Sequence, residues 1–287
     1  MITVFTPTYN RAHLLSVLYD SISNQSYRDF EWLIVDDGST DGTRDLVDKW
    51  IDDATFSIQY VYQENGGKHR AINRGAQMAQ GELFYIVDSD DKLPYNALET
   101  IMLYYNQIRE DNNFAGVCGL KAYFDGRLVQ PKVGYDILDC KGVDYNYRLN
   151  LFGGKAEVVK TDILKKYQFP EYNEEKYCGE SAIWNRIGSK YYFRYFAKII
   201  YSCEFYEDGL TKNSLKNRMN SPLSAMYIYK DLCELDVPYG VKIRAAVNYW
   251  RFYFCLKRKQ IPNLPIQYLP FCVLGCILHL LDLRKCM

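Results

Sequence analysis

Three carboxylates follow a short apolar run, and their spacing suits metal chemistry. Residues 83–87 read Leu-Phe-Tyr-Ile-Val and lead directly into Asp88, Ser89, Asp90 and Asp91. The apolar run is typical of a buried strand, so the acids stand at its exit. Unpaired acids there repel one another, and a hard divalent cation with oxygen ligands removes the repulsion. The pattern therefore indicates a site for Mg²⁺ or Mn²⁺ shared with a diphosphate.

A simpler interpretation of the same acids is structural. An Asp-rich turn could follow the strand, with Asp90 or Asp91 capping a helix that begins after Pro94. Spacing alone leaves both interpretations open. The choice between a metal site and a structural turn depends on the elements that position the acids.

Strand and helix patterns alternate along the first 90 residues. Short β-branched or apolar runs predict strands, and apolar residues three or four apart predict the helices between them. The predicted strands are Ile2–Phe5, Phe30–Val35, Ile58–Tyr62 and Leu83–Val87, and the predicted helices are Ala12–Ile22, Thr40–Trp50 (capped by Ser39 or Thr40) and Lys68–Met78. This order predicts an α/β fold with a doubly wound, mainly parallel central sheet flanked by helices.

Polar clusters stand at the end of each of these strands. They are Thr6–Arg11, Asp36–Ser39, Asn65–Arg70 and Asp88–Asp91. Ligands of open parallel sheets bind at the carboxyl ends of the strands. Four clusters at one edge of a sheet therefore predict a single ligand site.

Two of these clusters suit a nucleotide. Asp36 and Asp37 can accept hydrogen bonds from a base or from ribose, although an Asp-Gly turn is a common alternative. Asn65-Gly66-Gly67-Lys68 opens a helix, whose N-terminus favours an anion. A simple glycine turn remains the alternative there, and neighbouring His69 is a candidate contact or a structural histidine.

Beyond Pro94 the pattern changes. We expect a helix over Ala97–Ile108, a hairpin around residues 124–127 with antiparallel additions to the sheet, and less regular chain over Asp139–Val159. Shorter helices are predicted over Thr161–Tyr167 and from Glu180 to Ile187.

Composition narrows the function further. The 287 residues carry 35 basic and 35 acidic side chains, and this zero net charge argues against a nucleic-acid partner. The nine cysteines contain no Cys-x-x-Cys pair, which indicates reduced thiols in the cytoplasm. The N-terminal residues lack the basic and apolar regions of a signal peptide.

The four motifs together resemble a known family. Thr-Pro-Thr-Tyr-Asn-Arg from Thr6, Val-Asp-Asp-Gly-Ser-Thr-Asp from Val35, Asn-Gly-Gly-Lys-His-Arg from Asn65 and Val-Asp-Ser-Asp-Asp from Val87 are similar to those of family 2 glycosyltransferases. The resemblance covers the first third of the chain and rests on the order and spacing of four motifs. It implies a GT-A fold, of the kind found in bacterial capsule and surface-polysaccharide synthesis.

The resemblance also implies roles for residues. Thr6, Asp36 and Asp37 match positions that hold the base and ribose of the donor, and Asp88 and Asp90 match the family's D-x-D, which binds Mn²⁺ or Mg²⁺ and the donor diphosphate. From the four motifs, the predicted donor contacts are Thr6, Pro7, Tyr9, Asn10, Arg11, Asp36, Asp37, Asn65, Gly67, Lys68, His69, Asp88 and Ser89.

The catalytic base of the family comes from a Glu-Asp motif. Its counterpart here is Glu180 followed by Ser181, so the glutamate is kept and a serine stands where aspartate is common. Glu180 is therefore the candidate base that deprotonates an acceptor hydroxyl. The alternative role for Glu180 is an acid that stabilises a helix N-terminus.

The C-terminal part has a different character. We expect a transferase domain over residues 1–210 and a helical region over 211–287. Tyr268–Leu281 is an apolar run of about 14 residues, short of the roughly 20 that span a bilayer, with Arg284 and Lys285 after it. A segment that lies in the membrane interface fits this pattern, and packing on protein is the alternative.

These inferences predict an inverting, metal-dependent glycosyltransferase. It would move a sugar from a nucleotide-sugar, expected to be a UDP-sugar, to a glycan or lipid-linked glycan at the cytoplasmic face of the membrane. Two alternatives remain, a non-catalytic nucleotide- or glycan-binding module and a sugar-phosphate nucleotidyltransferase. The second would need a Gly-rich basic signature after the first strand, which Thr6–Asn10 does not supply.

Overall fold

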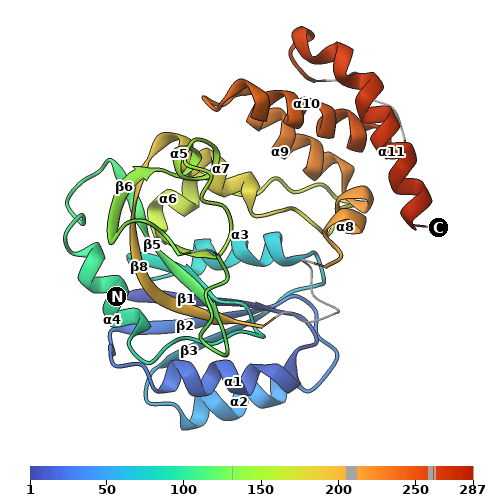
Figure 1. The fold of residues 1–287 in the computed structure, drawn as a ribbon. Coiled ribbons are helices and arrows are strands. Elements are labelled where there is room, and N and C mark those ends of the chain that lie inside the picture. Colours follow the sequence, from blue (N-terminus) through green and yellow to red (C-terminus); the bar gives the residue numbers. More distant parts are fainter. Residues whose placement is uncertain (131, 205–211, 258–260, 262, 287) are drawn as a thin grey trace.

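The computed structural model describes residues 1–130, 132–204, 212–257, 261 and 263–286 (Figure 1). The first elements are β1 (Ile2–Thr8), α1 (Ala12–Ser23), β2 (Phe30–Asp36), α2 (Thr43–Asp53), β3 (Ser57–Tyr62), α3 (Lys68–Met78), β4 (Leu83–Ile86) and α4 (Ala97–Tyr105). The middle of the chain forms β5 (Phe114–Tyr123), β6 (Ile137–Lys141), α5 (Gly142–Tyr147), β7 (Lys155–Lys160), α6 (Thr161–Lys166), α7 (Ser181–Lys190) and β8 (Tyr192–Cys203). The last elements are α8 (Ser214–Asn220), α9 (Pro222–Glu234), α10 (Tyr239–Tyr253), the 3₁₀ helix η1 (Ile266–Phe271) and α11 (Cys272–Cys286).

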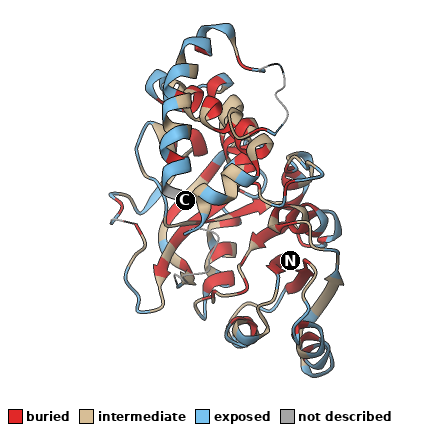
Figure 2. Ribbon diagram, turned by 90° about the vertical axis from the view of Figure 1, so that its right-hand side faces the viewer, coloured by how far each residue is buried: buried red, intermediate tan, exposed pale blue. Residues whose placement is uncertain are grey.

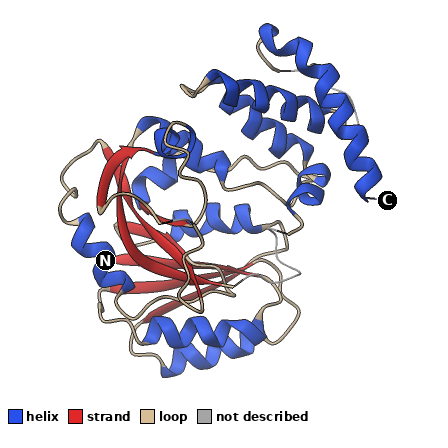
Figure 3. Ribbon diagram, in the orientation of Figure 1, coloured by secondary structure: helices blue, strands red, loops and turns tan. Residues whose placement is uncertain are grey.

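The strands of the described chain form one sheet in the order β3-β2-β1-β4-β7-β5-β8-β6. β3, β2, β1 and β4 run parallel to one another, as predicted. β7 runs antiparallel between β4 and β5, and β6 runs antiparallel to β8. Figure 3 shows helices on both sides of this sheet. The predicted α/β class is confirmed, and each antiparallel pair involves a strand that follows β4 in the chain.

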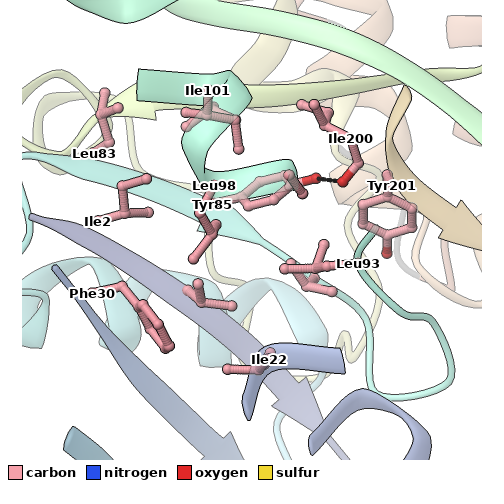
Figure 4. Packing of buried hydrophobic residues seen from close by; sticks show 14 of the residues in the cluster. Ile2, Ile22, Phe30, Leu83, Tyr85, Leu93, Leu98, Ile101, Ile200 and Tyr201 are labelled. Carbon is pink, nitrogen blue, oxygen red and sulfur yellow. Dashed lines mark hydrogen bonds between the residues drawn. The ribbon is translucent and has the colours of Figure 1, made fainter. Parts of the chain in front are cut away.

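One face of the sheet is covered by α1, α2 and α4. Alternate strand residues point into this layer and meet helix residues three or four positions apart. Figure 4 shows Leu98 and Ile101 of α4 close to Leu83 and Tyr85 of β4. The Tyr85 hydroxyl donates to the carbonyl of Ile200 at 3.0 Å, which satisfies a buried polar group and ties β4 to β8.

The other face is covered by α3, α6 and α7. Helix α3 lies very close to β1, since a Cβ added at Gly75 would lie 2.0 Å from the Phe5 ring. Ile72 and Ala76 of α3 and Ile183 of α7 are buried in this layer. Because both helices pack directly on the sheet, their N-termini lie at the edge where the parallel strands end (Figure 1).

The structure differs from the sequence prediction at several boundaries. Helix α2 begins at Thr43, not at Thr40, and neither Ser39 nor Thr40 caps it. The Ser39 hydroxyl instead accepts a hydrogen bond from the Asn10 amide, so it bonds the loop after β1 and not the start of α2. Helix α4 likewise has Asn96 as its N-cap, so neither Asp90 nor Asp91 caps it.

The predicted hairpin at residues 124–127 is present only in part. The turn closes with hydrogen bonds between Tyr123 and Gly126 and between Tyr123 and Arg127, but its second strand is a single bridge, Ala122 to Leu128. The chain over Asp139–Val159, expected to be irregular, contains the end of β6, α5 and most of β7. The long strand β8 was missed, since its apolar residues are interrupted by Arg194 and Lys198.

The C-terminal helices build a core of their own. Buried residues of α9, α10 and η1 form a separate apolar cluster. A buried side chain connects this region to the segment between α6 and α7, since the carboxylate of Glu175 accepts hydrogen bonds from the Leu223 and Ser224 amides at 2.6 and 2.8 Å. These amides open α9, where a negative charge is favourable. The predicted boundary between residues 210 and 211 lies outside the described residues.

The last helix is apolar on its outer face, and Figure 2 shows it largely exposed. Residues Ile266–Arg284 are long and apolar enough, by length and composition, to cross a membrane, with a mean hydropathy of 1.7 and 17% of that window buried. The helical segment is thus longer than the apolar run counted in the sequence. One such helix is weak evidence for a span, because the core helix of a soluble protein passes the same test.

No disulfide joins the eight cysteines whose side chains the structure describes. Burial raises the pKa of the Cys178 thiol to about 12, which keeps it protonated and inert.

Candidate functional site

Four strand ends meet at one edge of the sheet, as the sequence predicts. Thr8 of β1 pairs with Asp36 of β2, and Phe5 of β1 pairs with Ile86 of β4. Asp36 also pairs with Tyr62 at the end of β3. The polar clusters that follow these strands therefore come together although Thr6 and Asp91 are 85 positions apart in the chain.

The end of β1 is buried more deeply than a loop would be. Thr6 and Pro7 belong to the strand, and the Thr6 hydroxyl accepts a hydrogen bond from the indole of Trp32 at 2.9 Å. Thr6 is fully buried, so its hydroxyl serves the core in this state. Its contact with a nucleotide stays a prediction.

The loop after β1 is held in a specific shape. Asn10 has a positive φ of 52°, and its side-chain oxygen accepts a hydrogen bond from the Thr40 amide at 2.8 Å. Tyr9 is half exposed beside it, and Arg11 precedes α1 with its charge near Asp90. The loop thus presents an aromatic ring and a cation at the edge of the site.

The two aspartates after β2 are buried and already bonded. Asp36 accepts from the Ser39 amide at 2.7 Å and from the Tyr60 hydroxyl at 2.6 Å. Asp37 accepts from the amides of Gly66 and Gly67 at 2.9 and 2.7 Å. Their carboxylates therefore shape the edge of the site from within.

The Asp37 carboxylate fixes the conformation of the glycine loop, Asn65–Lys68, through hydrogen bonds. Besides the two glycine amides, its carboxylate accepts from the side chains of Gln63 and Asn65 at 2.7 and 3.1 Å. Gly67 has a φ of +101°, and a Cβ there would lie 1.9 Å from the carbonyl oxygen of Lys176. Only glycine fits this position, because the backbone of another segment passes against it.

Lys68 joins two acids that lie 92 positions apart in the chain (Asp88 and Glu180). Its ammonium lies 2.7 Å from an oxygen of Asp88 and 2.7 Å from an oxygen of Glu180. Burial alone would lower the pKa of Lys68, but the two carboxylates outweigh it and raise the pKa. The Lys68 ammonium in turn holds the pKa of Glu180 well below its usual range. The predicted base and the first predicted metal ligand thus share one cation.

Glu180 is positioned at the start of α7. It is the N-cap residue of that helix, and its second carboxylate oxygen accepts from the Trp184 indole at 3.3 Å. Ser181 is the first residue of the helix. The predicted base therefore lies at the same edge of the sheet as the aspartates after β4.

The three acids after β4 differ in surroundings. Burial and the charge of Asp88 raise the pKa of Asp90. Asp91 is buried and accepts from the Tyr201 hydroxyl at 2.5 Å, and the same hydroxyl accepts from the Asp88 amide at 3.0 Å. Asp91 is a structural acid that fixes the turn, whereas Asp88 and Asp90 face the site. Ser89 between them is buried.

His69 is buried beneath the glycine loop. Its ring meets Phe169 edge-on, and within the described residues neither ring nitrogen has a hydrogen-bond partner. Burial lowers the pKa of His69 to about 4. A direct contact with a donor stays a prediction that would require this loop to move.

The acids after β4 fit a divalent cation that is shared with a ligand. Among the described residues, no group of three or more His, Cys, Asp or Glu side chains is arranged to hold a metal ion alone. Asp88 and Asp90 offer hard carboxylate oxygens. Burial and, after it, the charge of Asp88 raise the pKa of Asp90, and a cation would relieve the repulsion between the two acids. A cation there would need further oxygen ligands, which a diphosphate can supply.

The residues that support these acids are not predicted by the sequence motifs. Tyr201 comes from β8, and Trp184 comes from the second turn of α7. Lys121 of β5 lies with its ammonium 3.9 Å from the centre of the Tyr201 ring. No motif marks these positions, because they reach the site through the order of the strands.

Comparison with known proteins identifies the chain. Residues 3–138 match the family model "Glycosyl transferase family 2", and these residues hold the four motifs and the strand ends described above. These residues form a family 2 glycosyltransferase domain. Of the interpretations of the sequence, the transferase is therefore confirmed.

A curated relative extends the similarity beyond the matched domain. The chain is 29% identical over 244 residues to the GalNAc(5)-diNAcBac-PP-undecaprenol beta-1,3-glucosyltransferase of Campylobacter jejuni. That alignment covers 80% of this chain and 74% of the relative. The glycosyltransferase GlyG of Streptococcus pneumoniae is 37% identical, but the chain spans only 36% of its length.

Solved structures share the fold. S. aureus TarS 1-349 in complex with UDP-GlcNAc superposes with a TM-score of 0.63 at 20% identity, over 96% of this chain and 79% of that one. The mannosyltransferase PcManGT of Pyrobaculum calidifontis, in complex with GDP-Man and Mn²⁺, gives a TM-score of 0.58 at 18% identity, over 98% and 87% of the two chains. The predicted GT-A architecture is confirmed for this glycosyltransferase.

Proposed function

We propose that this glycosyltransferase moves a sugar from a UDP-sugar to a lipid-linked glycan during surface-polysaccharide assembly, with inversion at the anomeric carbon. The observation that carries the proposal is the pair of contacts from Lys68 to Asp88 and Glu180. It brings a candidate base within reach of the residues expected to hold the donor diphosphate.

The donor would lie across the strand ends. The loop after β1, with Tyr9 and Arg11, would border the nucleotide, and the Gly66–Gly67 turn would approach its phosphates. Asp88 and Asp90 would hold Mn²⁺ or Mg²⁺, which when bound neutralises charge on the leaving diphosphate. The UDP-GlcNAc complex of TarS supports the choice of UDP, and the Mn²⁺ complex of PcManGT supports the metal.

Lys68 connects donor binding to the base. A diphosphate would compete with Glu180 for the ammonium, since the diphosphate of a UDP-sugar carries two negative charges and the carboxylate carries one. As the ammonium turns to the phosphates, Glu180 loses the partner that holds its pKa low. It then becomes a stronger base at the moment when the donor is in place.

The transfer itself is one displacement. Glu180 removes the proton from the acceptor hydroxyl while that oxygen attacks the anomeric carbon. A carbon–oxygen bond forms on one face, and the bond to the diphosphate oxygen breaks on the other, so the configuration inverts. Ser181 cannot take the proton in place of Glu180, because a serine hydroxyl is far less basic than a carboxylate.

The acceptor would be presented at a membrane. The Campylobacter relative is named for a glycan on PP-undecaprenol, and it aligns with 80% of this chain. The outer face of α11 exposes Val273, Leu274, Ile277 and Leu280 at helical spacing. An exposed apolar face of this kind suits the lipid interface, with Arg284 at its end; the side chain of Lys285 lies outside the described residues.

The helix would lie in the interface and not cross it. Asp282 on the inner face of α11 is buried, and both of its oxygens accept from Arg251 of α10. Gly275 brings α11 close to α10, since a Cβ there would lie 2.3 Å from the Cβ of Trp250. Crossing a membrane would separate these groups and leave an unpaired acid in the lipid.

A release assay tests the function. Wild type and Asp90→Ala are incubated with UDP-glucose, UDP-galactose or UDP-GlcNAc, with Mn²⁺ or with EDTA, in the presence of bacterial lipid extract. We expect metal-dependent release of UDP from one donor, lost in the variant. Calorimetry with UDP on the same samples reports binding separately, and an absence of metal-dependent UDP or UDP-sugar binding would contradict the proposal.

A further inference from the structure

A second charged group lines the same edge of the sheet, on β7. Glu157 pairs with Cys118 of β5, and its neighbour Val158 pairs with Tyr85 of β4. Because β7 runs antiparallel to β4, Glu157 lies toward the end of β4 from which Asp88 and Asp90 follow. Neither the sequence motifs nor the mechanism above uses this residue.

The Glu157 side chain is largely buried, but its carboxylate accepts few hydrogen bonds. Its side chain is 17% exposed, and its one ion-pair partner in the described chain is the ammonium of Lys155 at 3.7 Å. That distance is too long for a hydrogen bond. The backbone amide of Glu157 itself donates to the carboxylate, and no described side chain donates a hydrogen bond to it, although a carboxylate can accept about four.

The nearby lysines, Lys155 and Lys121, do not fully neutralise the Glu157 carboxylate. The Lys155 ammonium donates to the side-chain oxygen of Asn146 at 2.6 Å, which anchors it away from Glu157. Burial raises the pKa of Glu157, while Lys155 and Lys121 lower it and the charge of Glu180 raises it. Glu157 is therefore within electrostatic reach of the candidate base, and it has acceptor capacity to spare.

A sheltered carboxylate with missing donors is costly unless a ligand supplies them. Sugar hydroxyls are donors of this kind, and the site already handles a sugar. Binding sites that bond a substrate hydroxyl discriminate strongly against substrates that lack it. The side chain of Lys155 is 13% exposed, and its ammonium can donate a hydrogen bond to a ring or hydroxyl oxygen of the same sugar.

We infer that Glu157, with Lys155 beside it, is a specificity residue that accepts hydrogen bonds from hydroxyl groups of the hexose bound next to Glu180. The inference rests on the proposed function and deepens it. The hexose is either the transferred sugar of the donor or the terminal sugar of the acceptor, and the two sources are separated by the experiment.

The experiment compares wild type, Glu157→Gln and a control, Glu110→Gln, which changes an exposed glutamate far from the site. Calorimetry with Mn²⁺ measures the Kd for UDP and for the UDP-sugar of the panel (UDP-glucose, UDP-galactose, UDP-GlcNAc) that wild type binds most tightly. Saturation-transfer NMR with UDP and Mn²⁺ measures binding of methyl β-glucoside and methyl N-acetyl-β-glucosaminide as acceptor probes. Thermal unfolding is recorded for each protein.

We expect Glu157→Gln to keep its Kd for UDP within twofold and to weaken one sugar contact by about tenfold, the usual effect of losing a hydrogen bond to a charged group. A weaker Kd for the UDP-sugar assigns the donor sugar, and a loss of the glycoside signal assigns the acceptor sugar. The Tm should not fall, because the variant removes a sheltered charge. Glu110→Gln should match wild type throughout.

Three results would overturn the inference. If Glu157→Gln binds both the UDP-sugar and the glycosides as wild type does, Glu157 does not contact a sugar. If the variant loses UDP and UDP-sugar binding equally, Glu157 has a general structural role. If Glu157→Gln fails to fold, Lys155→Gln takes its place, and unchanged sugar binding in that variant refutes the inference. Failure of wild type to bind any UDP-sugar would instead refute the proposed function itself, together with this inference.

Discussion

The ammonium of Lys68 lies 2.7 Å from a carboxylate oxygen of Glu180, although 112 positions separate the two residues in the chain. The contact joins the N-terminus of α3 to the N-terminus of α7. Both helices pack on the same face of the sheet, so their first residues reach the edge where β1, β2 and β4 end. The site therefore depends on two helix starts as well as on four strand ends.

Replacing the lysine tests this contact. Lys68→Met should lower UDP release by about 100-fold, because it removes the cation that we propose to bind the diphosphate. It should also raise the pKa of Glu180, which Lys68 holds low in the wild type. The acid limb of the kcat/KM profile then moves to higher pH, because the base is protonated more easily.

Lys49→Met is the control for this change. Lys49 is exposed on α2, far from the ends of the strands, and its loss should leave both rate and pH profile unchanged. An acid limb that stays in place in Lys68→Met would show that Glu180 is not the titrating base.

The glycine loop gives a second test. Asp37→Asn replaces a carboxylate that accepts four hydrogen bonds, including those from the amides of Gly66 and Gly67. The asparagine amide group would face N–H donors, so we expect a loss of about 2 kcal/mol in the free energy of unfolding. UDP affinity should fall as well. Urea unfolding and calorimetry measure both, with exposed Asp48→Asn as control.

How much the sequence could predict differs between these residues. The pattern at the strand ends was enough to place Asp36, Asp37, Asp88 and Asp90 at one edge, because parallel strands bring their carboxyl ends together. Their individual tasks were not predictable. Asp37 supports the loop through backbone amides, and Asp91 binds Tyr201, a partner 110 positions away that no local spacing reveals.

The proposed metal ligand Asp90 gives a third prediction. Burial and Asp88 raise the pKa of Asp90 above its unfolded value, so the charged form costs stability in the folded state. This cost begins as pH rises through the unfolded pKa of about 4 and is complete above the folded one. Asp90→Asn should therefore unfold at equal or higher urea concentration at pH 7, and the gain should vanish at lower pH.

The same variant should lose metal-dependent binding of UDP. Calorimetry with Mn²⁺ and with EDTA measures this, and Asp52→Asn on the exposed end of α2 is the control. A variant that is destabilised at pH 7 and still binds UDP with metal would assign Asp90 a structural role instead.

The buried histidine gives a prediction for pH. Burial lowers the pKa of His69 to about 4, whereas the unfolded chain takes up a proton near 6.5. Above 6.5 neither state binds this proton, and between 6.5 and 4 only the unfolded state does, so wild type loses up to about 3 kcal/mol as pH falls. His69→Phe should lose less stability over this range, and exposed His13→Phe should behave as wild type in urea unfolding at each pH.

The outer face of α11 gives the last prediction. Leu280 is 54% exposed there, opposite the face on which Asp282 binds Arg251. Leu280→Glu should weaken sedimentation with anionic phospholipid vesicles by about tenfold or more, because a charge would have to enter the apolar layer. Leu103→Glu makes the same change at an exposed leucine of α4 and should have no effect. Equal vesicle binding by all three proteins, with Arg251 and Asp282 intact, would mean that α11 packs on protein and that the acceptor reaches Glu180 without a membrane contact from this helix.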